Sequence, residues 1–124
     1  MESLSPNLFV KDIKKAIDFY KKLGFKTTMS VPEKAPFVWV MMKCGNVTFM
    51  LQTMKSLGKD LPEIKRTSGG SLLFYINIKG IRKFHKKIKG KVKVLSELEK
   101  TFYGATEFSI KDADGYVLTF AEHE

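Results

Sequence analysis

Apolar and polar residues follow the same order twice along the chain, first over Leu8–Gly24 and again over Leu73–Lys89. In each segment, a short apolar run typical of a strand precedes apolar residues at the spacing of an amphipathic helix. Aligned positions share identical residues: Leu8/Leu73, Phe9/Phe74, Ile13/Ile78, Lys14/Lys79, Phe19/Phe84, Lys21/Lys86 and Lys22/Lys87. Such an internal repeat indicates two copies of one strand–helix unit.

The first half of the chain reads as β-α-β-β-β. Asp12 is a favourable helix N-cap, and Gly24 is a plausible end for the same helix. Apolar runs bounded by Pro and Gly predict the strands. The expected elements are a strand over 6–11, a helix over 12–23, and strands over 25–31, 37–43 and 47–53.

The second half repeats this order. Asn77 is the predicted N-cap of its helix, and Asp112–Gly115 is a hairpin turn because Asp-Gly adopts the positive φ that such turns need. The expected elements are a strand over 70–76, a helix over 78–88, and strands over 91–95, 106–111 and 116–122.

Residues 55–69 have the composition of a linker, with at most a helical turn. Module one therefore spans about 1–54 and module two about 70–124. A chain of 124 residues is one domain by size. Each half alone is too small for a sturdy core, so we expect the two modules to form a single domain.

Composition favours a cytoplasmic protein. No apolar run is long enough to span a membrane, and Met1–Pro6 lacks the basic and apolar regions of a signal peptide. The single cysteine, Cys44, excludes an internal disulfide and fits a reducing compartment.

The chain is basic, with a formal net charge of +9, and eight Lys and Arg residues lie between Lys79 and Lys93 without an acidic residue among them. Such a segment could bind nucleic acid or an acidic partner. The lysines, however, fall between the apolar positions of the predicted helix, where a solvated face is expected. No aromatic residue is interleaved on that face to stack on bases, so nucleic acid is not the favoured partner.

Two motifs identify a family. The opening motif within Asp12–Phe25 (Asp…Phe-Tyr…Leu-Gly-Phe) and the closing motif within Tyr103–Tyr116 (Tyr-Gly…Asp-Ala-Asp-Gly-Tyr) resemble the vicinal oxygen chelate superfamily. That superfamily includes glyoxalase I, extradiol dioxygenases, fosfomycin-resistance transferases and bleomycin-resistance binding proteins. Ala113 departs from the family pattern, which usually has Pro there.

The resemblance implies an α+β fold in which two β-α-β-β-β modules form a curved eight-stranded mixed sheet around a cleft. The helices would lie outside, and the protein would form a homodimer. Strand alternation independently places apolar residues on one face and mixed residues on the other, and a mixed face suits a small-molecule site. The predicted cleft residues are Ser5, Asn7, Phe9, Trp39, Thr48, Met50, Gln52, Ser71, Tyr103, Glu107 and Thr119.

The resemblance also implies a divalent metal, held in most catalytic members by His, Glu or Gln on four cleft strands. Counting from the motifs places those positions at Ser5, Met50, Ser71 and Thr119, with Gly70 as the alternative third position. Hydroxyl and thioether groups are not usual ligands for Zn, Ni, Mn or Fe. We therefore expect no metal and no cofactor.

Other candidate chemistry is sparse. Gln52 and Glu107 are expected near the cleft, but at positions that do not match the metal ligands of the family. His85 lies in a predicted outer helix, where a structural role is favoured, and His123 lies near the end of the chain. Phe102 and Tyr103 precede a turn at the expected cleft rim and are the best candidates for stacking on a ligand.

Three functions remain open. The first is a metal-independent binding protein that holds a small molecule in the cleft between its modules, with a neutral or anionic ligand favoured by the positive charge. The second is an enzyme of the same superfamily: a glyoxalase-like lyase, a dioxygenase, or an isomerase that uses Glu107 as its base. The third is a basic adaptor that binds nucleic acid or an acidic partner through residues 79–93.

Overall fold

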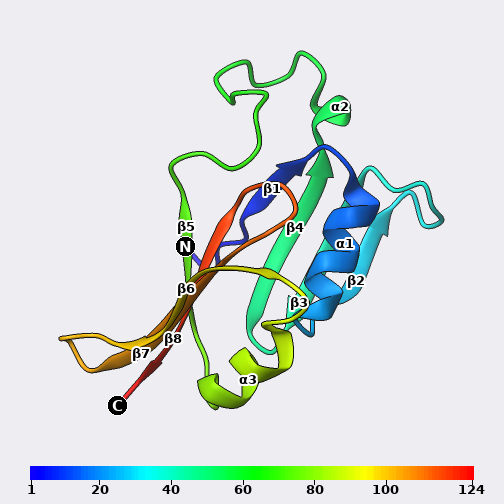
Figure 1. The fold of residues 1–124 in the computed structure, drawn as a ribbon. Helices are drawn as coiled ribbons and strands as arrows, with labels where there is room; N and C mark the ends of the chain where they lie inside the picture. The colour runs from blue at the N-terminus through cyan, green and yellow to red at the C-terminus, as the bar shows by residue number, and fades with distance from the viewer. The chain divides into compact units, whose positions relative to one another are not determined.

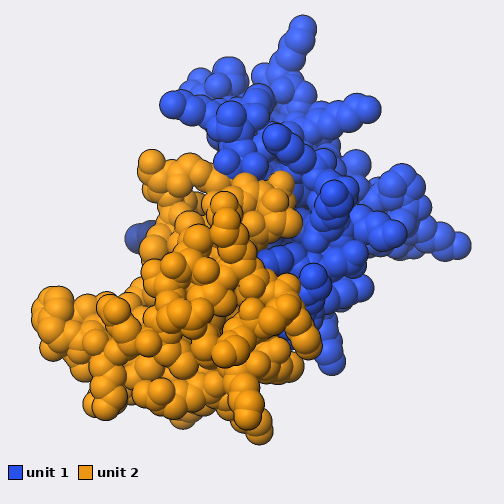
Figure 2. Space-filling model, viewed as in Figure 1, with its two compact units in different colours: residues 1–68 blue, residues 69–124 orange.

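The computed structural model describes residues 1–124, which divide into two compact units, Met1–Ser68 and Gly69–Glu124 (Figure 2). Each unit contains a four-stranded mixed sheet with a helix packed on one face (Figure 1). The predicted α+β class with two β-α-β-β-β modules is confirmed. The structure contains no helix with the length and apolar character needed to cross a membrane.

The first unit has the strand order β1-β4-β3-β2, in which β1 is parallel to β4 and the other neighbours are antiparallel. Its elements are β1 (Asn7–Val10), α1 (Ile13–Lys22), β2 (Lys26–Val31), β3 (Trp39–Cys44), β4 (Val47–Thr53) and the short α2 (Met54–Leu57).

Helix α1 begins where the sequence predicts. The Asp12 carboxylate accepts a hydrogen bond from the backbone N–H of Lys15 at 3.1 Å, which caps the helix. The buried face of α1 packs on the sheet, where Tyr20 contacts Phe25 and Phe49 at ring-centroid distances of 5.6 and 5.4 Å. This aromatic cluster anchors α1 to β4 and leaves the opposite face of the sheet without a helix.

The segment predicted as a linker is folded in part. Residues 58–68 belong to the first unit, and the Arg66 guanidinium donates to the carbonyl oxygens of Gly58 and Leu61 at 2.9 and 3.0 Å. It also donates to the carbonyls of Asp60 and Ile64. One side chain therefore closes this loop on itself.

The second unit has the strand order β5-β8-β7-β6, with β5 parallel to β8. Its elements are β5 (Leu73–Asn77), α3 (Ile81–Ile88), β6 (Lys93–Lys100), β7 (Ala105–Lys111) and β8 (Val117–His123). Phe84 of α3 contacts Phe120 of β8 at 4.9 Å between ring centroids. The predicted Asp112 turn joins β7 to β8, and the Asp112 carboxylate accepts from the backbone N–H groups of Asp114 and Tyr116 at 2.9 Å each.

Helix α3 does not begin where the repeat predicts. Asn77 is the last residue of β5 and pairs with Ala121 rather than capping a helix, and the N–H of Ile78 donates to the carbonyl of Ala121 at 2.8 Å. The helix begins only after Gly80, which has a φ of 72° and no side-chain cap. The N–H groups of Gly80 and Ile81 donate instead to the Glu122 carboxylate at 3.1 and 3.0 Å. A residue of β8 therefore supplies the cap that Asn77 was expected to provide.

Three strand boundaries also differ from the prediction. Strand β6 continues to Lys100, whereas the prediction ended it at residue 95. Register shifts between Val94 and Ser96 and between Ser96 and Glu99 interrupt the alternation of its side chains, so the sequence pattern did not reveal its second half. Strand β3 begins at Trp39, after the two prolines of the β2–β3 connection. Strand β5 begins at Leu73 rather than at residue 70, so Leu72 lies outside the strand and is 50% exposed.

Candidate ligand-binding faces

The helix-free face of the first sheet carries mixed apolar and polar residues. Every second side chain of β4 lies on the face of the sheet opposite α1. The residues of β1 and β3 that pair with them have their side chains on the same face. Asn7 and Met41 both pair with Met50, and Phe9 and Trp39 both pair with Gln52. The half-buried residues of this face are Asn7, Phe9, Trp39, Met41, Thr48, Met50 and Gln52.

A chain of hydrogen bonds orients the amides of this face. The Asn7 Nδ2 group donates to Gln52 Oε1 at 2.9 Å, and Gln52 Nε2 donates to Ser56 Oγ at 3.1 Å. Asn7 Oδ1 is buried and accepts no hydrogen bond. Buried polar atoms are nearly always paired, so this acceptor marks a point where a ligand donor would add a missing hydrogen bond.

The helix-free face of the second sheet carries a cluster of four polar side chains. Tyr75 and Tyr103 both donate their phenol protons to Oε2 of Glu107, the latter at 2.6 Å. Because the Tyr75 proton is used in this way, Tyr75 Oη accepts from Nε2–H of His123, at 3.1 Å. Nearby, the hydroxyls of Ser109 and Thr119 are hydrogen-bonded to each other at 2.8 Å.

The cluster keeps its phenols protonated. The hydrogen bond to Glu107 is the largest cause that raises the pKa of Tyr75 above its ordinary value, followed by desolvation and by repulsion from the same carboxylate. The hydrogen bond to Glu107 likewise raises the pKa of Tyr103. A phenolate beside a carboxylate is disfavoured, so the cluster presents two phenol groups and one carboxylate at neutral pH.

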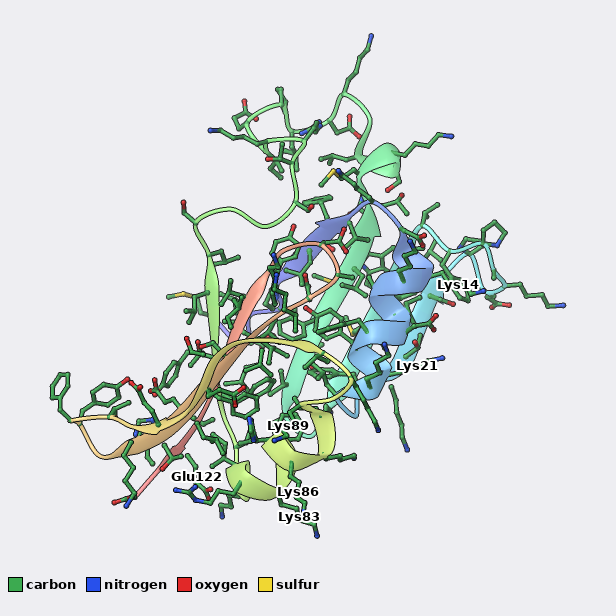
Figure 3. The ribbon with its side chains drawn as sticks, viewed as in Figure 1. Lys14, Lys21, Lys83, Lys86, Lys89 and Glu122 are labelled. Carbon is green, nitrogen blue, oxygen red and sulfur yellow. The ribbon has the colours of Figure 1, made fainter.

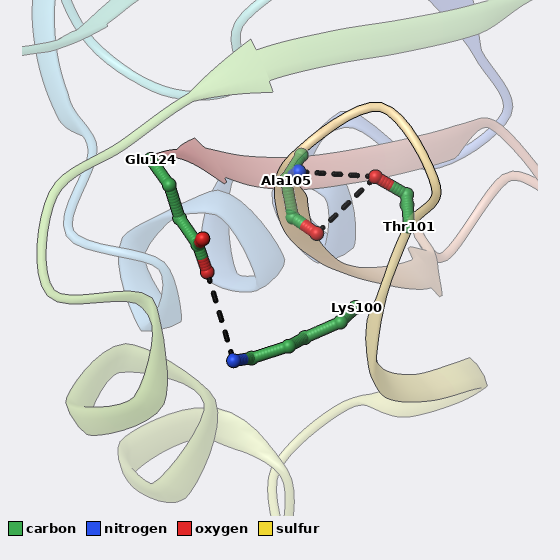
Figure 4. Close-up of polar contacts among 4 residues, drawn as sticks. All are labelled: Lys100, Thr101, Ala105 and Glu124. Carbon is green, nitrogen blue, oxygen red and sulfur yellow. Dashed lines mark hydrogen bonds and ion pairs between the residues drawn. The ribbon is translucent and has the colours of Figure 1, made fainter.

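The loop before β7 positions Tyr103. Thr101 Oγ1 accepts from the N–H of Ala105 at 3.1 Å and donates to the carbonyl of Ala105 at 3.2 Å, which closes the loop (Figure 4). The N–H of Glu124 donates to the Gly104 carbonyl at 2.9 Å, and Lys100 lies 3.8 Å from the Glu124 carboxylate (Figure 4). Thr101 within the loop and Glu124 just after β8 therefore hold the loop in place.

The structure groups most of the predicted cleft residues within each unit. Asn7, Phe9, Trp39, Thr48, Met50 and Gln52 share the helix-free face of the first sheet, and Tyr103, Glu107 and Thr119 lie on that of the second. Ser5 precedes β1, beside Pro6, whose carbonyl accepts from Met50 N–H at 2.8 Å. Ser71 is exposed, lies before β5 and does not join the cluster.

Sequence reasoning missed Tyr75 and His123. Tyr75 lies four positions after Ser71, so strand alternation alone could have placed both on one face. His123 was treated as part of the chain end. Only the pairing of β5 and β7 with β8 brings these two side chains to Glu107.

The residues at the family's metal positions do not fit a divalent ion. Ser5, Met50, Ser71 and Thr119 offer hydroxyl and thioether groups, and the Thr119 hydroxyl already pairs with Ser109. Divalent metals of this kind prefer imidazole, thiolate and carboxylate ligands. The structure gathers no group of three or more His, Cys, Asp or Glu residues that could hold a metal.

His85 lies in the core of the second unit, as the structural interpretation predicted. Its side chain is 10% exposed, contacts Phe108 at 4.9 Å between ring centroids and pairs with Glu97 at 2.8 Å. The Lys and Arg residues between 79 and 93 are all exposed, and Lys83 and Lys86 project from α3 away from the sheet (Figure 3). This arrangement is that of a solvated helix face.

Comparison with known structures supports one fold. The chain is similar to TioX from Micromonospora sp. ML1 (14% identity, TM-score 0.78, all of both chains covered). It is also similar to the hypothetical protein SA1046 from S. aureus (24% identity, TM-score 0.77, covering 98% of this chain and 94% of that one). A lactoylglutathione lyase from Agrobacterium tumefaciens has 18% identity and a TM-score of 0.71, covering 98% of this chain and 94% of that one.

No curated protein gives a significant sequence match. A family model, in contrast, matches residues 4–120, which is nearly the whole chain and includes both motifs on which the resemblance rests. The chain belongs to the glyoxalase/bleomycin resistance protein/dioxygenase superfamily.

Proposed function

We propose that this protein binds a small, uncharged aromatic molecule without a metal, through the helix-free face of its second sheet. The observation that carries the proposal is the cluster of Tyr75, Tyr103 and Glu107. Both phenols bind Oε2 of Glu107, and no hydrogen bond from the protein reaches Oε1. This second oxygen is available to a hydroxyl or amide donor on a ligand.

The surroundings of Glu107 favour aromatic ligands. Tyr75 and Tyr103 are 43% and 52% exposed, and Phe102 is fully exposed at the tip of the same loop. Tyr103 and Phe102 contact each other edge to face, with ring centroids 5.1 Å apart. Exposed rings beside a single hydrogen-bonding group are typical of sites that bind the flat face of a ligand and fix its orientation.

Charge favours a neutral ligand. The Glu107 carboxylate would repel an anion at close range, while the net charge of +9 disfavours the approach of a cation. An uncharged molecule with one strong donor satisfies both conditions. We place this binding protein in a reducing compartment, which the single Cys44 suggests. We also expect it to form a homodimer, as is common in this superfamily.

The test uses three related probes. 2-Naphthol carries a donor, 2-methoxynaphthalene lacks it, and 2-naphthoate is an anion. We expect 2-naphthol to bind most tightly in a fluorescence titration, because only its hydroxyl can donate to Glu107. Glu107→Gln should reduce this preference about tenfold, the effect of exchanging a charge-assisted hydrogen bond for a neutral one.

A matched control is available on the neighbouring strand. Glu99 of β6 is paired with Glu107 but accepts no phenol proton, so Glu99→Gln removes the same charge from the same face. This variant should keep the preference for 2-naphthol. Equal binding of all three probes, or stoichiometric Zn, Ni, Mn or Fe in the purified protein, would contradict the proposal.

The same cluster favours a second candidate, a metal-independent isomerase in which Glu107 removes a proton and Tyr75 or Tyr103 donates one. The two phenols and the carboxylate are already within hydrogen-bonding distance, as general acid–base catalysis requires. Exchange of the α-protons of an aromatic ketone with D2O, followed by NMR, distinguishes this enzyme from a binding protein. Exchange that depends on Glu107 but not on Glu99 would support it.

A further inference from the structure

A cavity lies in the first unit, on the side of the sheet that carries α1. It has a volume of about 610 Å³ and opens between α1 and the connection from β2 to β3. Its walls are mainly apolar and include Ile17 of α1 and Pro36 and Phe37 of the connection. Small-molecule sites typically have volumes of about 300–1,000 Å³ and apolar walls. Because it lies on the side of the sheet that carries α1, this cavity is distinct from the site proposed above.

Three exposed charged residues of α1 line the rim of this cavity: Lys14, Asp18 and Lys21 (Lys14 and Lys21 are labelled in Figure 3). Residues four and three positions apart lie on one face of a helix, about 5–6 Å from each other. The rim therefore presents a positive, a negative and a positive charge in a row.

These charges are available to a ligand. Neither lysine forms an ion pair with Asp18, since the ion pairs of the structure lie elsewhere. Asp12, the other acidic residue of the lining, is already engaged because its carboxylate accepts from the N–H of Lys15 at the start of α1. A ligand that supplied charges of both signs would satisfy Asp18 and a lysine together.

We propose that this cavity binds an aromatic α-amino acid in its zwitterionic form. The ring packs against Ile17, Pro36 and Phe37, the ammonium group pairs with Asp18, and the carboxylate pairs with Lys14 or Lys21. A ligand with only a carboxylate would be repelled by the unpaired Asp18 carboxylate. A ligand with only an ammonium group would be repelled by the two lysines. Specificity for the zwitterion thus arises from repulsion of both single-charge analogues as well as from attraction.

The experiment titrates the full chain with three probes and follows backbone amide shifts of α1 by NMR. L-phenylalanine carries both charges, 3-phenylpropionate lacks the ammonium group, and phenethylamine lacks the carboxylate. We expect L-phenylalanine to bind about tenfold more tightly than either analogue, as the loss of one paired charge would give. The shifts should be confined to α1 and residues 35–37.

Variants on the surface of α1 test the role of each charge without disturbing the core. Asp18→Asn should weaken L-phenylalanine about tenfold while leaving or improving the binding of 3-phenylpropionate. Lys21→Met should weaken L-phenylalanine, whereas Lys22→Met, one residue outside the lining, should not. Binding by L-phenylalanine no tighter than by an analogue, an unchanged affinity in Asp18→Asn, or no shift at about 10 mM L-phenylalanine would overturn the proposal. None of these outcomes depends on Glu107, so each is separate from the test of the proposed function.

Discussion

The unpaired oxygen of Asn7 makes a quantitative prediction, because two similar substitutions should have different effects on stability. Asn7→Leu removes one hydrogen bond, to Gln52 at 2.9 Å, and also removes the buried acceptor that lacks a partner. Loss of the hydrogen bond costs about 1 kcal/mol, while removal of an unsatisfied buried group recovers about 1–3 kcal/mol. The free energy of unfolding should therefore stay unchanged or rise by up to about 2 kcal/mol.

Gln52→Leu is the matched substitution. It removes the same hydrogen bond and also the bond from Gln52 to Ser56 at 3.1 Å, and it leaves the Asn7 amide with no partner on either atom. The free energy of unfolding should fall by about 1–3 kcal/mol, the cost of leaving a buried polar group unsatisfied.

Urea unfolding followed by the fluorescence of Trp39 measures both variants. Trp39 is the single tryptophan of the chain and is paired with Gln52, so its emission reports on the first sheet. Each midpoint, multiplied by the slope of the transition, gives the free energy of unfolding, and its difference from the value for the unmodified chain gives the change. If Asn7→Leu proved as destabilising as Gln52→Leu, the Asn7 oxygen would have a partner in solution, and the argument that it is held ready for a ligand would fail.

Three further predictions concern the second unit and the assembly. Hydrogen bonds from Ile81 and Gly80 lower the pKa of Glu122, so the stability that they provide is present above the ordinary pKa of a glutamate and is lost as the pH falls through the lowered value. Glu122→Gln should remove that part of the pH dependence in urea titrations between about pH 5 and 2. Lys83→Glu combined with Lys87→Glu should change stability by roughly 0.5 kcal/mol or less and leave 2-naphthol binding unchanged, and a large loss of affinity would favour the adaptor hypothesis. Sedimentation at micromolar concentration should give a homodimer of twice 14.2 kDa, and a monomer at every concentration would refute it.

The sequence predicts best those elements whose stabilising contacts are local. Helix α1 begins at the expected residue because its cap is local: Asp12 accepts a hydrogen bond from the N–H of Lys15, three positions along the chain. The predicted start of α3 was wrong because the residue that caps the helix, Glu122, lies 41 residues beyond Ile81. No local pattern reports such a contact, and the resemblance of Asn77 to Asp12 in the repeat pointed to the wrong residue.

The same limit applies to the candidate site. Glu107 and Tyr103 were predicted because a motif and a turn mark their surroundings. Tyr75 and His123 join them through the pairing of β5 and β7 with β8. The cavity beside α1 was not predicted, since it depends on where residues 35–37 lie in space rather than on a pattern of residue types.

The register of the repeat explains why Tyr75 lies on the helix-free face of the second sheet. Aligned by identical residues, Leu8 matches Leu73 and Val10 matches Tyr75, yet Leu8 and Val10 are buried, whereas Leu73 and Tyr75 are 52% and 43% exposed. A shift of one residue moves every side chain of a strand to the other face of its sheet. The second copy has undergone this shift relative to the sequence alignment, so that Ile76, rather than Tyr75, is buried with the helix. The position that anchors α1 in the first module thereby presents a phenol to Glu107 in the second. Divergence in register, more than in composition, gives the two modules different helix-free faces, one with paired amides and the other with an acid between two tyrosines.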